Sequence, residues 1–235
     1  MPQLTTLETR PNRSVYDLVV AAFVGMLLIS NIGATKLIAF GPDWSVGGAQ
    51  LLPILTDGGA ILFPLTYILG DVLAEVYGLR RANRTIITGF VLAAVMSLTF
   101  VIVDIAPPSP DWPNQDAWHT VLGVVPRFVV ASLLGYLAGQ LLNALVLVRI
   151  KERWGERHLW VRLITSTIVG ELADTAVFSL IAWSTLGNFL GGDAVPWPAV
   201  INFFLVGWIY KVVVEAVMLP VTLRVIPWVK RREAA

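Results

Sequence analysis

Cysteine is absent from the 235-residue sequence, which excludes disulfide bonds, thiolate nucleophiles and cysteine-based metal sites. Histidine is nearly absent as well, because His119 and His158 are the two copies and both lie in expected loops. The HExxH, GxSxG and P-loop patterns of metalloproteases, hydrolases and nucleotide-binding enzymes do not occur. We therefore expect neither an enzyme nor a bound metal or cofactor, and direct use of ATP would need a partner protein.

Charged residues are also scarce, at 14% of the chain, whereas soluble domains carry roughly 25%. Hydrophobic residues make up 56% and group into runs of about 20 residues or more, the length that crosses a bilayer. The pattern predicts an all-α integral membrane protein with six transmembrane helices. We expect these spans at 15–40, 59–78, 85–105, 121–148, 163–187 and 199–224. The stretch 41–58 is too polar and glycine-rich to span, and we expect it to form a small cap on one face.

Lysine and arginine are absent from the first, third and fifth connections between these spans. Fourteen of the 17 basic residues lie in the alternate segments: Arg10, Arg13, Arg80, Arg81, Arg84, Arg149, Lys151, Arg153, Arg157, Arg162, Arg224, Lys230, Arg231 and Arg232. The positive-inside rule places those segments, and therefore both termini, in the cytoplasm. The predicted protein is multi-pass in the cytoplasmic (inner) membrane, with a cytoplasmic tail 1–14, a single six-helix domain 15–226 and a basic cytoplasmic tail 227–235. Topology explains the basic loops, so we expect no nucleic-acid partner.

Eight charged residues lie three or more residues inside the ends of the predicted spans, where each costs about 2.5–3.5 kcal/mol on the insertion scale. They are Lys36, Arg127, Lys211, Asp71, Glu75, Glu171, Asp174 and Glu215. The three bases can neutralise three of the five acids. The remaining acids must be protonated, face water or bind a ligand, which predicts a transport site rather than a purely structural bundle.

The spacing of these charges aligns them in stripes. Two pairs are spaced four residues apart, namely Asp71 with Glu75 and Lys211 with Glu215. A third pair, Glu171 with Asp174, is spaced three residues apart. At either spacing the two side chains of a pair share one helix face. Charged faces avoid lipid, and the stripes are therefore expected to converge on an interior cavity. Other side chains extend the stripes or add polar groups to the spans: Asn31, Tyr67, Gln140, Asn143, Phe178, Asn202, Phe204 and Trp208.

Small residues recur every four positions on the fourth span, at Ala131, Gly135 and Gly139. Such spacing allows close helix approach. It is compatible with a contact inside the chain or with the seam of a homodimer.

Four ordered motifs carry a family resemblance over about 15–226. They are Ser30-Asn31-Ile32-Gly33-Ala34-Thr35-Lys36-Leu37-Ile38, the stretch 63–78 followed by Arg80-Arg81-Ala82-Asn83, Gly170-Glu171-Leu172-Ala173-Asp174-Thr175-Ala176-Val177-Phe178, and Lys211-Val212-Val213-Val214-Glu215 followed by Pro220. Together they resemble the bacterial queuosine precursor transporter family, which is also grouped with vitamin-uptake-type transporters.

This resemblance implies import of the 7-deazaguanine precursors of queuosine, in their cyano and aminomethyl forms, for salvage into tRNA modification. It implies a fold similar to the six-helix substrate-binding subunits of energy-coupling-factor transporters, without their ATPase module. Glu171 or Asp174 would accept hydrogen bonds from the ring, an asparagine or lysine would serve its carbonyl, and Phe178 or Trp208 would stack on it. The expected substrate-binding residues are Asn31, Lys36, Tyr67, Asp71, Glu75, Glu171, Asp174, Phe178, Asn202, Trp208, Lys211 and Glu215.

Three other functions compete with this one. The first alternative is a substrate-binding subunit for another vitamin-like solute, docked on a shared ATPase module. From another class, it would be a membrane scaffold or assembly protein whose buried charges are balanced structural pairs. A membrane enzyme using paired carboxylates is the third, and the lack of histidine in the spans argues against it.

Overall fold

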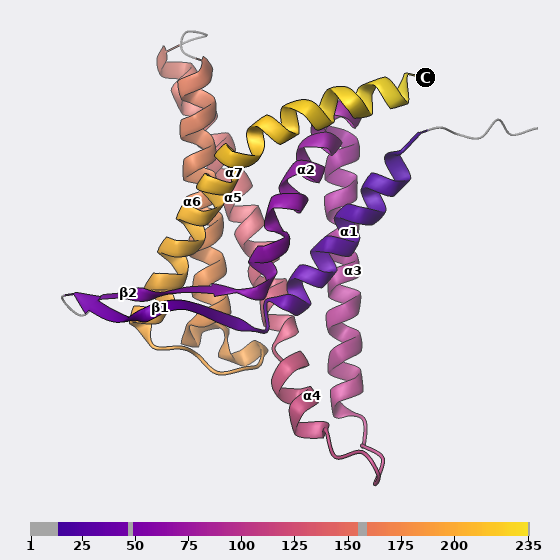
Figure 1. The fold of residues 1–235 in the computed structure, drawn as a ribbon, viewed down its shortest axis with the longest axis vertical. Helices are drawn as coiled ribbons and strands as arrows, with labels where there is room; N and C mark the ends of the chain where they lie inside the picture. The colour runs from indigo at the N-terminus through magenta and orange to yellow at the C-terminus, as the bar shows by residue number, and fades with distance from the viewer. Residues whose placement is uncertain (1–13, 47–48, 155–158, 235) are drawn as a thin grey trace, which may run out of the picture.

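The computed structural model describes residues 14–46, 49–154 and 159–234, and most of the chain is helical (Figure 1). Residues 1–13 of the predicted N-terminal tail, with Arg10 and Arg13, lie outside this range, as do Arg157, His158 and Ala235. The elements in chain order are α1 (Tyr16–Gly33), β1 (Leu37–Val46), β2 (Ala49–Asp57), η1 (Gly58–Leu62), α2 (Phe63–Tyr77), α3 (Leu79–Ile105), α4 (Gln115–Leu122), α5 (Val125–Trp154), α6 (Leu159–Trp183), η2 (Thr185–Leu190) and α7 (Trp197–Glu233).

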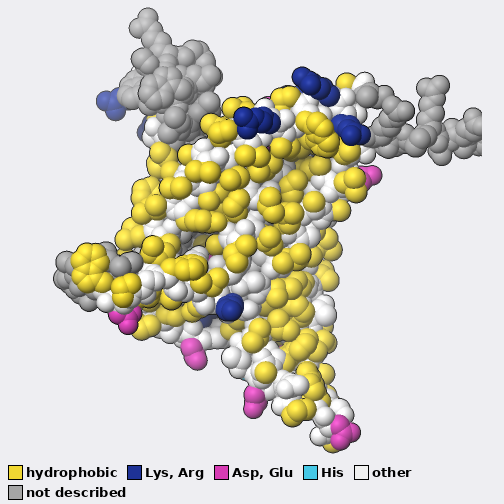
Figure 2. All heavy atoms as spheres, viewed as in Figure 1, with side chains coloured by type: hydrophobic (Ala, Val, Ile, Leu, Met, Phe, Trp, Pro, Cys, Tyr) yellow, Lys and Arg dark blue, Asp and Glu magenta, His cyan; other side chains and the backbone are white. Residues whose placement is uncertain are grey.

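The described residues contain six helical segments that are long and apolar enough to cross a membrane, which confirms the predicted number of spans. Hydrophobic side chains cover the middle of the face in Figure 2, whereas Lys and Arg gather toward its upper end and Asp and Glu toward its lower end. The start of α1 and the end of α7 lie at that same upper end (Figure 1). Which side of the membrane this end faces stays a prediction from the positive-inside rule.

The first predicted span is too long, and the cap after it has a form that was not predicted. α1 ends at Gly33 rather than near residue 40, and the chain continues as the antiparallel hairpin β1–β2. The run Leu37–Phe40 is apolar but pairs with Ile54–Asp57 as strand, and a short apolar run alone cannot distinguish helix from strand. A Cβ built at Gly58 would lie 2.6 Å from the Gly33 carbonyl oxygen, so glycine there lets the hairpin return close to the end of α1.

Asn202 of α7 holds the hairpin in place. Its Oδ1 accepts a hydrogen bond from the Leu55 amide at 3.0 Å, and its Nδ2 donates to the Pro53 carbonyl at 3.1 Å. These bonds satisfy the edge of β2 that β1 does not cover, so β2 lies against α7. The expectation that Asn202 is a polar group of the cavity is therefore wrong, because both ends of its amide are used to fix this edge strand.

α5 and α6 form the tightest helix pair of the molecule, and their contact is built on small residues. A Cβ built at Gly139 would lie 2.9 Å from both Asp174 Cβ and the Gly170 carbonyl oxygen, and Ala131 and Gly135 are buried beside it. Of the two alternatives for the small-residue stripe, the structure shows the contact inside the chain, between α5 and α6. Because α6 covers Ala131, Gly135 and Gly139, this stripe is not open to a second copy.

Arg127 ties the start of α5 to the end of α6. Its side chain is 1% exposed, and Nε donates to the Ile181 carbonyl at 2.8 Å while Nη2 donates to that of Ser184. Nη1 lies 3.2–3.4 Å from Asn188 Oδ1 and from the carbonyl oxygens of the loop 191–193. A helix end leaves its last carbonyls without intrahelical partners, and a cation there is favourable. Arg127 is therefore a structural cation outside the cavity.

α7 runs further than the predicted span 199–224 and includes most of the predicted basic tail. It carries Pro220 and Pro227 inside the helix, and it bends before its C-terminal part crosses the ends of α1 and α2 (Figure 1). The Glu233 carboxylate fastens this end, because its Oε1 accepts from the Val15 amide at 2.7 Å and from the Tyr77 hydroxyl at 2.9 Å. The segment 227–235 is helical through Glu233 rather than a free tail.

Arg127→Lys is expected to destabilise the protein. A lysine ammonium keeps the positive charge but cannot bond all the carbonyl oxygens that the Arg127 guanidinium contacts at the end of α6 and in the loop 191–193. Each buried acceptor left unpaired costs about 1–3 kcal/mol. The midpoint of thermal unfolding in detergent should fall by at least about 4 °C, whereas Arg84→Lys on the exposed start of α3 should leave it unchanged. Equal midpoints for the two variants would contradict the structural role of Arg127.

Gly139→Ala is expected to lower stability without changing the oligomeric state, since the added methyl group meets α6 at 2.9 Å. Gly25→Ala is the matched control, because a Cβ built there has nothing within 4 Å. Thermal unfolding and size-exclusion chromatography with light scattering measure both properties. A change in oligomeric state at unchanged stability would show instead that the stripe is a seam between copies.

Candidate functional site

A cavity of about 610 Å³ lies between the helices and is lined by residues from all six spans and from the β2–η1 junction. Its walls mix aromatic and polar groups. The polar side chains are Ser30, Asn31, Thr56, Asp57, Thr66, Tyr67, Asp71, Ser132, Tyr136, Gln140, Asn143, Thr167, Glu171, Asp174, Thr175, Ser179, Tyr210, Lys211 and Glu215. The three charged stripes meet at this cavity through five of their six residues, and Glu75 is the one that lies outside its wall.

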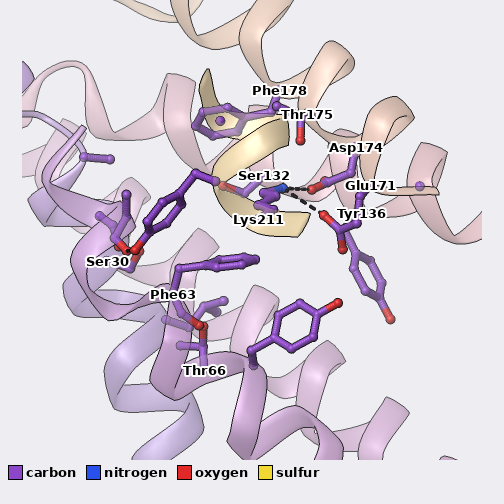
Figure 3. A pocket seen from close by; sticks show the side chains of 18 of the residues that line it. Ser30, Phe63, Thr66, Ser132, Tyr136, Glu171, Asp174, Thr175, Phe178 and Lys211 are labelled. Atoms are coloured by element: carbon purple, nitrogen blue, oxygen red, sulfur yellow. Dashed lines mark hydrogen bonds and ion pairs between the residues drawn. The ribbon is translucent and has the colours of Figure 1, made fainter. Parts of the chain in front are cut away.

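Lys211 of α7 lies between two carboxylates of α6 at the centre of this cavity (Figure 3). Its Nζ donates a hydrogen bond to Asp174 Oδ2. The same Nζ lies 3.5 Å from Glu171 Oε2, and this second contact is an ion pair without a hydrogen bond. All three side chains are about four-fifths buried, and Nζ also lies 5.5 Å from the centroid of the Phe63 ring. The spacing of three residues on α6 turns both acids toward α7, where one lysine serves both.

A second group of acids lies on the facing surfaces of α2 and α7. Asp71 of α2 and Glu215 of α7 both line the cavity, and Tyr67 of α2 belongs to the same wall. Asp57, which sequence analysis did not select, also lines the cavity and caps η1 by accepting from the Gly59 and Ala60 amides at 2.9 and 3.2 Å. Burial raises the pKa of the Asp57 carboxyl, while these two backbone bonds act in the opposite direction.

Acids outnumber bases in the cavity wall. The described residues that line it include one base, Lys211, and five acids: Asp57, Asp71, Glu171, Asp174 and Glu215. The predicted excess of buried acids is therefore present in three dimensions. The arrangement suits a ligand that offers hydrogen-bond donors or positive charge.

Eight of the twelve expected binding residues line the cavity: Asn31, Tyr67, Asp71, Glu171, Asp174, Phe178, Lys211 and Glu215. The structure does not bring the other four there. Lys36 and Glu75 are exposed, Asn202 holds the hairpin, and Trp208 is half-buried but lies outside the cavity wall. Lys36 falls beyond the end of α1, so the helix register that would have turned it inward does not exist.

Several neutral residues of the wall escaped sequence analysis. Trp183 stacks on Phe203 with ring centroids 4.6 Å apart, and Phe128 and Phe178 pack against the same indole at 5.0 and 6.4 Å. Hydroxyl and aromatic residues in apolar spans look like packing residues in a sequence. The one sequence signal for these neutral residues was their helical spacing from the charged stripes, which indicates the cavity side of the helix.

Three buried polar atoms of the wall have no hydrogen-bond partner within the described part of the chain. They are Asn143 Oδ1, Glu171 Oε2 and Thr175 Oγ1. The indole nitrogens of Trp118 and Trp208 are also buried without a partner, but neither residue lines the cavity. An unpaired buried polar atom is costly, and a group of three in one cavity indicates where a polar ligand would be held.

Six helices long and apolar enough to cross a membrane surround a charged internal cavity, and this architecture defines the chain as a multi-pass membrane protein of the kind that transports small solutes. Comparison with known families agrees with this class. The model of the family described as "Putative vitamin uptake transporter" matches residues 57–225. The chain belongs to this family of transporters, which confirms the family resemblance and agrees with the prediction that it is not an enzyme.

Curated relatives carry a more specific name. The chain is 30% identical to the "Probable queuosine precursor transporter" of Bacillus subtilis (strain 168) over 73% of this chain and 72% of that protein. It is 27% identical to the "Queuosine precursor transporter" of Escherichia coli (strain K12), over 72% and 71% of the two chains. No solved structure matches the chain.

Lys211→Gln is expected to destabilise the protein strongly, because it leaves Glu171 and Asp174 buried without their cation. Breaking a buried pair from one side costs about 3–5 kcal/mol. Adding Asp174→Asn to Lys211→Gln removes one of the stranded charges and should restore part of the loss. Thermal unfolding in detergent measures all variants, with Lys36→Gln as the exposed control. Wild-type stability of Lys211→Gln would show that the three residues are not coupled.

Proposed function

We propose that this protein imports the 7-deazaguanine precursors of queuosine, 7-cyano-7-deazaguanine and 7-aminomethyl-7-deazaguanine, through the cavity between its helices. The observation that carries the proposal is the set of buried oxygens on an acidic wall that have no hydrogen-bond partner among the described residues. The names of the curated relatives support the same substrate class.

The cavity has a suitable size for such a solute. Pockets that hold small molecules typically measure about 300–1,000 Å³, and the volume here is about 610 Å³. A flat bicyclic ring also needs an apolar surface to lie against. The aromatic group of Trp183, Phe203 and Phe178 provides one within the same wall.

Hydrogen-bond chemistry favours a ring with several N–H donors. A 7-deazaguanine carries donors at its ring nitrogens and its exocyclic amine, and one carbonyl acceptor. Asn143 Oδ1 has no hydrogen-bond donor within the described residues, and Glu171 Oε2 has an ion pair with Lys211 at 3.5 Å but no hydrogen bond, so such a ring would supply donors that the wall lacks. The aminomethyl form adds a cation, which the excess of acids around Lys211 favours.

Ligand-induced stabilisation tests this function. A ligand that binds only the folded state raises stability by RT ln(1 + [L]/Kd), about 2.7 kcal/mol at a concentration of 100 Kd. We expect a saturable rise in the unfolding temperature of the detergent-purified protein with either precursor, and uptake of both by proteoliposomes. Glu171→Gln should lose the rise, whereas Glu75→Gln, whose side chain is exposed outside the cavity, should keep it.

Guanine serves as the ligand control, because it shares the donor edge but lacks the substituent at position 7. Absence of any shift with both precursors, in protein shown to be folded, would contradict the proposed substrates. The search would then move to another vitamin-like solute for the same cavity. A shift that Glu171→Gln leaves intact would contradict the assigned site while keeping the substrate class.

A further inference from the structure

We infer that Asn143 and Thr175 are specificity-determining residues which, together with Glu171, read the edge of a guanine-type ring through its amine, its ring N–H and its carbonyl. The inference rests on the proposed function and assigns the recognition to three atoms. Asn143 Oδ1 would accept from the exocyclic amine and Glu171 Oε2 from the ring N–H. The Thr175 hydroxyl would donate to the carbonyl.

The three residues lie in this order along one side of the α5–α6 pair. Asn143 of α5 packs directly against α6 at Gly170, where an added Cβ would lie 2.9 Å from the Asn143 Cβ. Glu171 follows Gly170, and Thr175 follows Glu171 by four residues, a rise of about 6 Å along the helix axis. All three line the cavity, so a flat ligand beside α6 can meet them together.

Close packing holds this row of groups in place. A Cβ at Gly139 or at Gly170 would overlap the opposite helix, so the backbones of α5 and α6 are in direct contact one turn before Asn143. Lys211 holds the Glu171 carboxylate from the α7 side at 3.5 Å. Preorganised groups of this kind lose little freedom when they bind, which favours discrimination between similar ligands.

The Thr175 hydroxyl differs from three helical threonine hydroxyls of this chain that bond their own helix. Those of Thr85, Thr88 and Thr99 each donate to the carbonyl four residues earlier, at 3.1, 2.9 and 2.8 Å. Thr175 is 3% exposed, and its Oγ1 makes no such bond to residue 171 or to any other described residue. Local satisfaction by the helix is the ordinary outcome for threonine, so its absence at a buried cavity wall indicates a ligand partner.

The order acceptor, acceptor, donor fits one type of purine-like edge. A guanine-type ring presents amine, ring N–H and carbonyl in sequence, and all three groups would be paired. An adenine-type edge places an unprotonated ring nitrogen where the N–H should be, so two lone pairs would face each other at Glu171. A ring that lacks the exocyclic amine leaves Asn143 Oδ1 unpaired, and sites built for hydrogen bonds reject such analogues strongly.

Paired ligands and paired variants test the inference. The dissociation constants of 7-cyano-7-deazaguanine and of its analogue without the exocyclic amine are measured by calorimetry on wild type, Asn143→Ala, Thr175→Val, Thr175→Ser and Thr99→Val. Wild type should prefer the full ligand by about tenfold or more. Asn143→Ala should reduce this ratio to near one by weakening the full ligand alone.

The threonine variants report on the carbonyl, which both ligands carry. Thr175→Val keeps the shape but removes the hydroxyl, and should weaken both ligands by about tenfold without changing their ratio. Thr175→Ser restores the hydroxyl and should restore the affinity. Thr99→Val removes a hydroxyl that already bonds its own helix on the outer surface of α3, and should match wild type.

The ratio of the two affinities is internal to each variant, so a smaller folded fraction does not affect it. An unchanged ratio in Asn143→Ala, or wild-type affinity in Thr175→Val, would overturn the assignment while leaving the proposed function intact. Failure of wild type to bind either deazaguanine would overturn the proposed function, and this inference with it.

Discussion

The pairing of Lys211 with Glu171 and Asp174 is the interaction on which the site depends. Charges at membrane depth persist where they are paired or face a polar interior, so one lysine on α7 and two acids on α6 hold the two helices face to face. Asp174 also lies where Gly135 and Gly139 let α5 approach most closely. Charge pairing and the small-residue contact therefore act at the same place, and both set the width of the cavity beside them.

Three polar side chains outside the cavity, Arg127, Asn202 and Glu233, are satisfied within the protein. Arg127 bonds the carbonyls at the end of α6, Asn202 bonds the edge of β2, and Glu233 bonds the start of α1. A bilayer offers no water to such groups, so a membrane protein has to pair them internally. Asn143, Glu171 and Thr175 are different, because each has a buried oxygen without a hydrogen-bond partner among the described residues and lines a space that a solute can enter. This contrast separates the structural polar residues from those proposed to bind.

Sequence analysis was accurate where lipid restricts the choice of residues. The number of spans and the convergence of the acidic stripes followed from hydrophobic length and from the cost of facing charge toward lipid. It was wrong for Lys36, Glu75, Asn202 and Trp208 as cavity residues. Lys36 and Asn202 depended on the hairpin, and an apolar strand such as Leu37–Phe40 looks like the end of a helix until its partner is known.

The sequence by itself determined the class of this protein, its six membrane spans and its family, because the length of apolar runs, the placement of charges and the order of motifs are local properties. Tertiary structure alone decided that Ala131, Gly135 and Gly139 face α6, that Arg127 is structural, and that Thr175 has a hydroxyl without a partner. Each of these facts depends on how α6 packs against its neighbours. Only their packing determines which polar groups pair with one another and which remain for a solute.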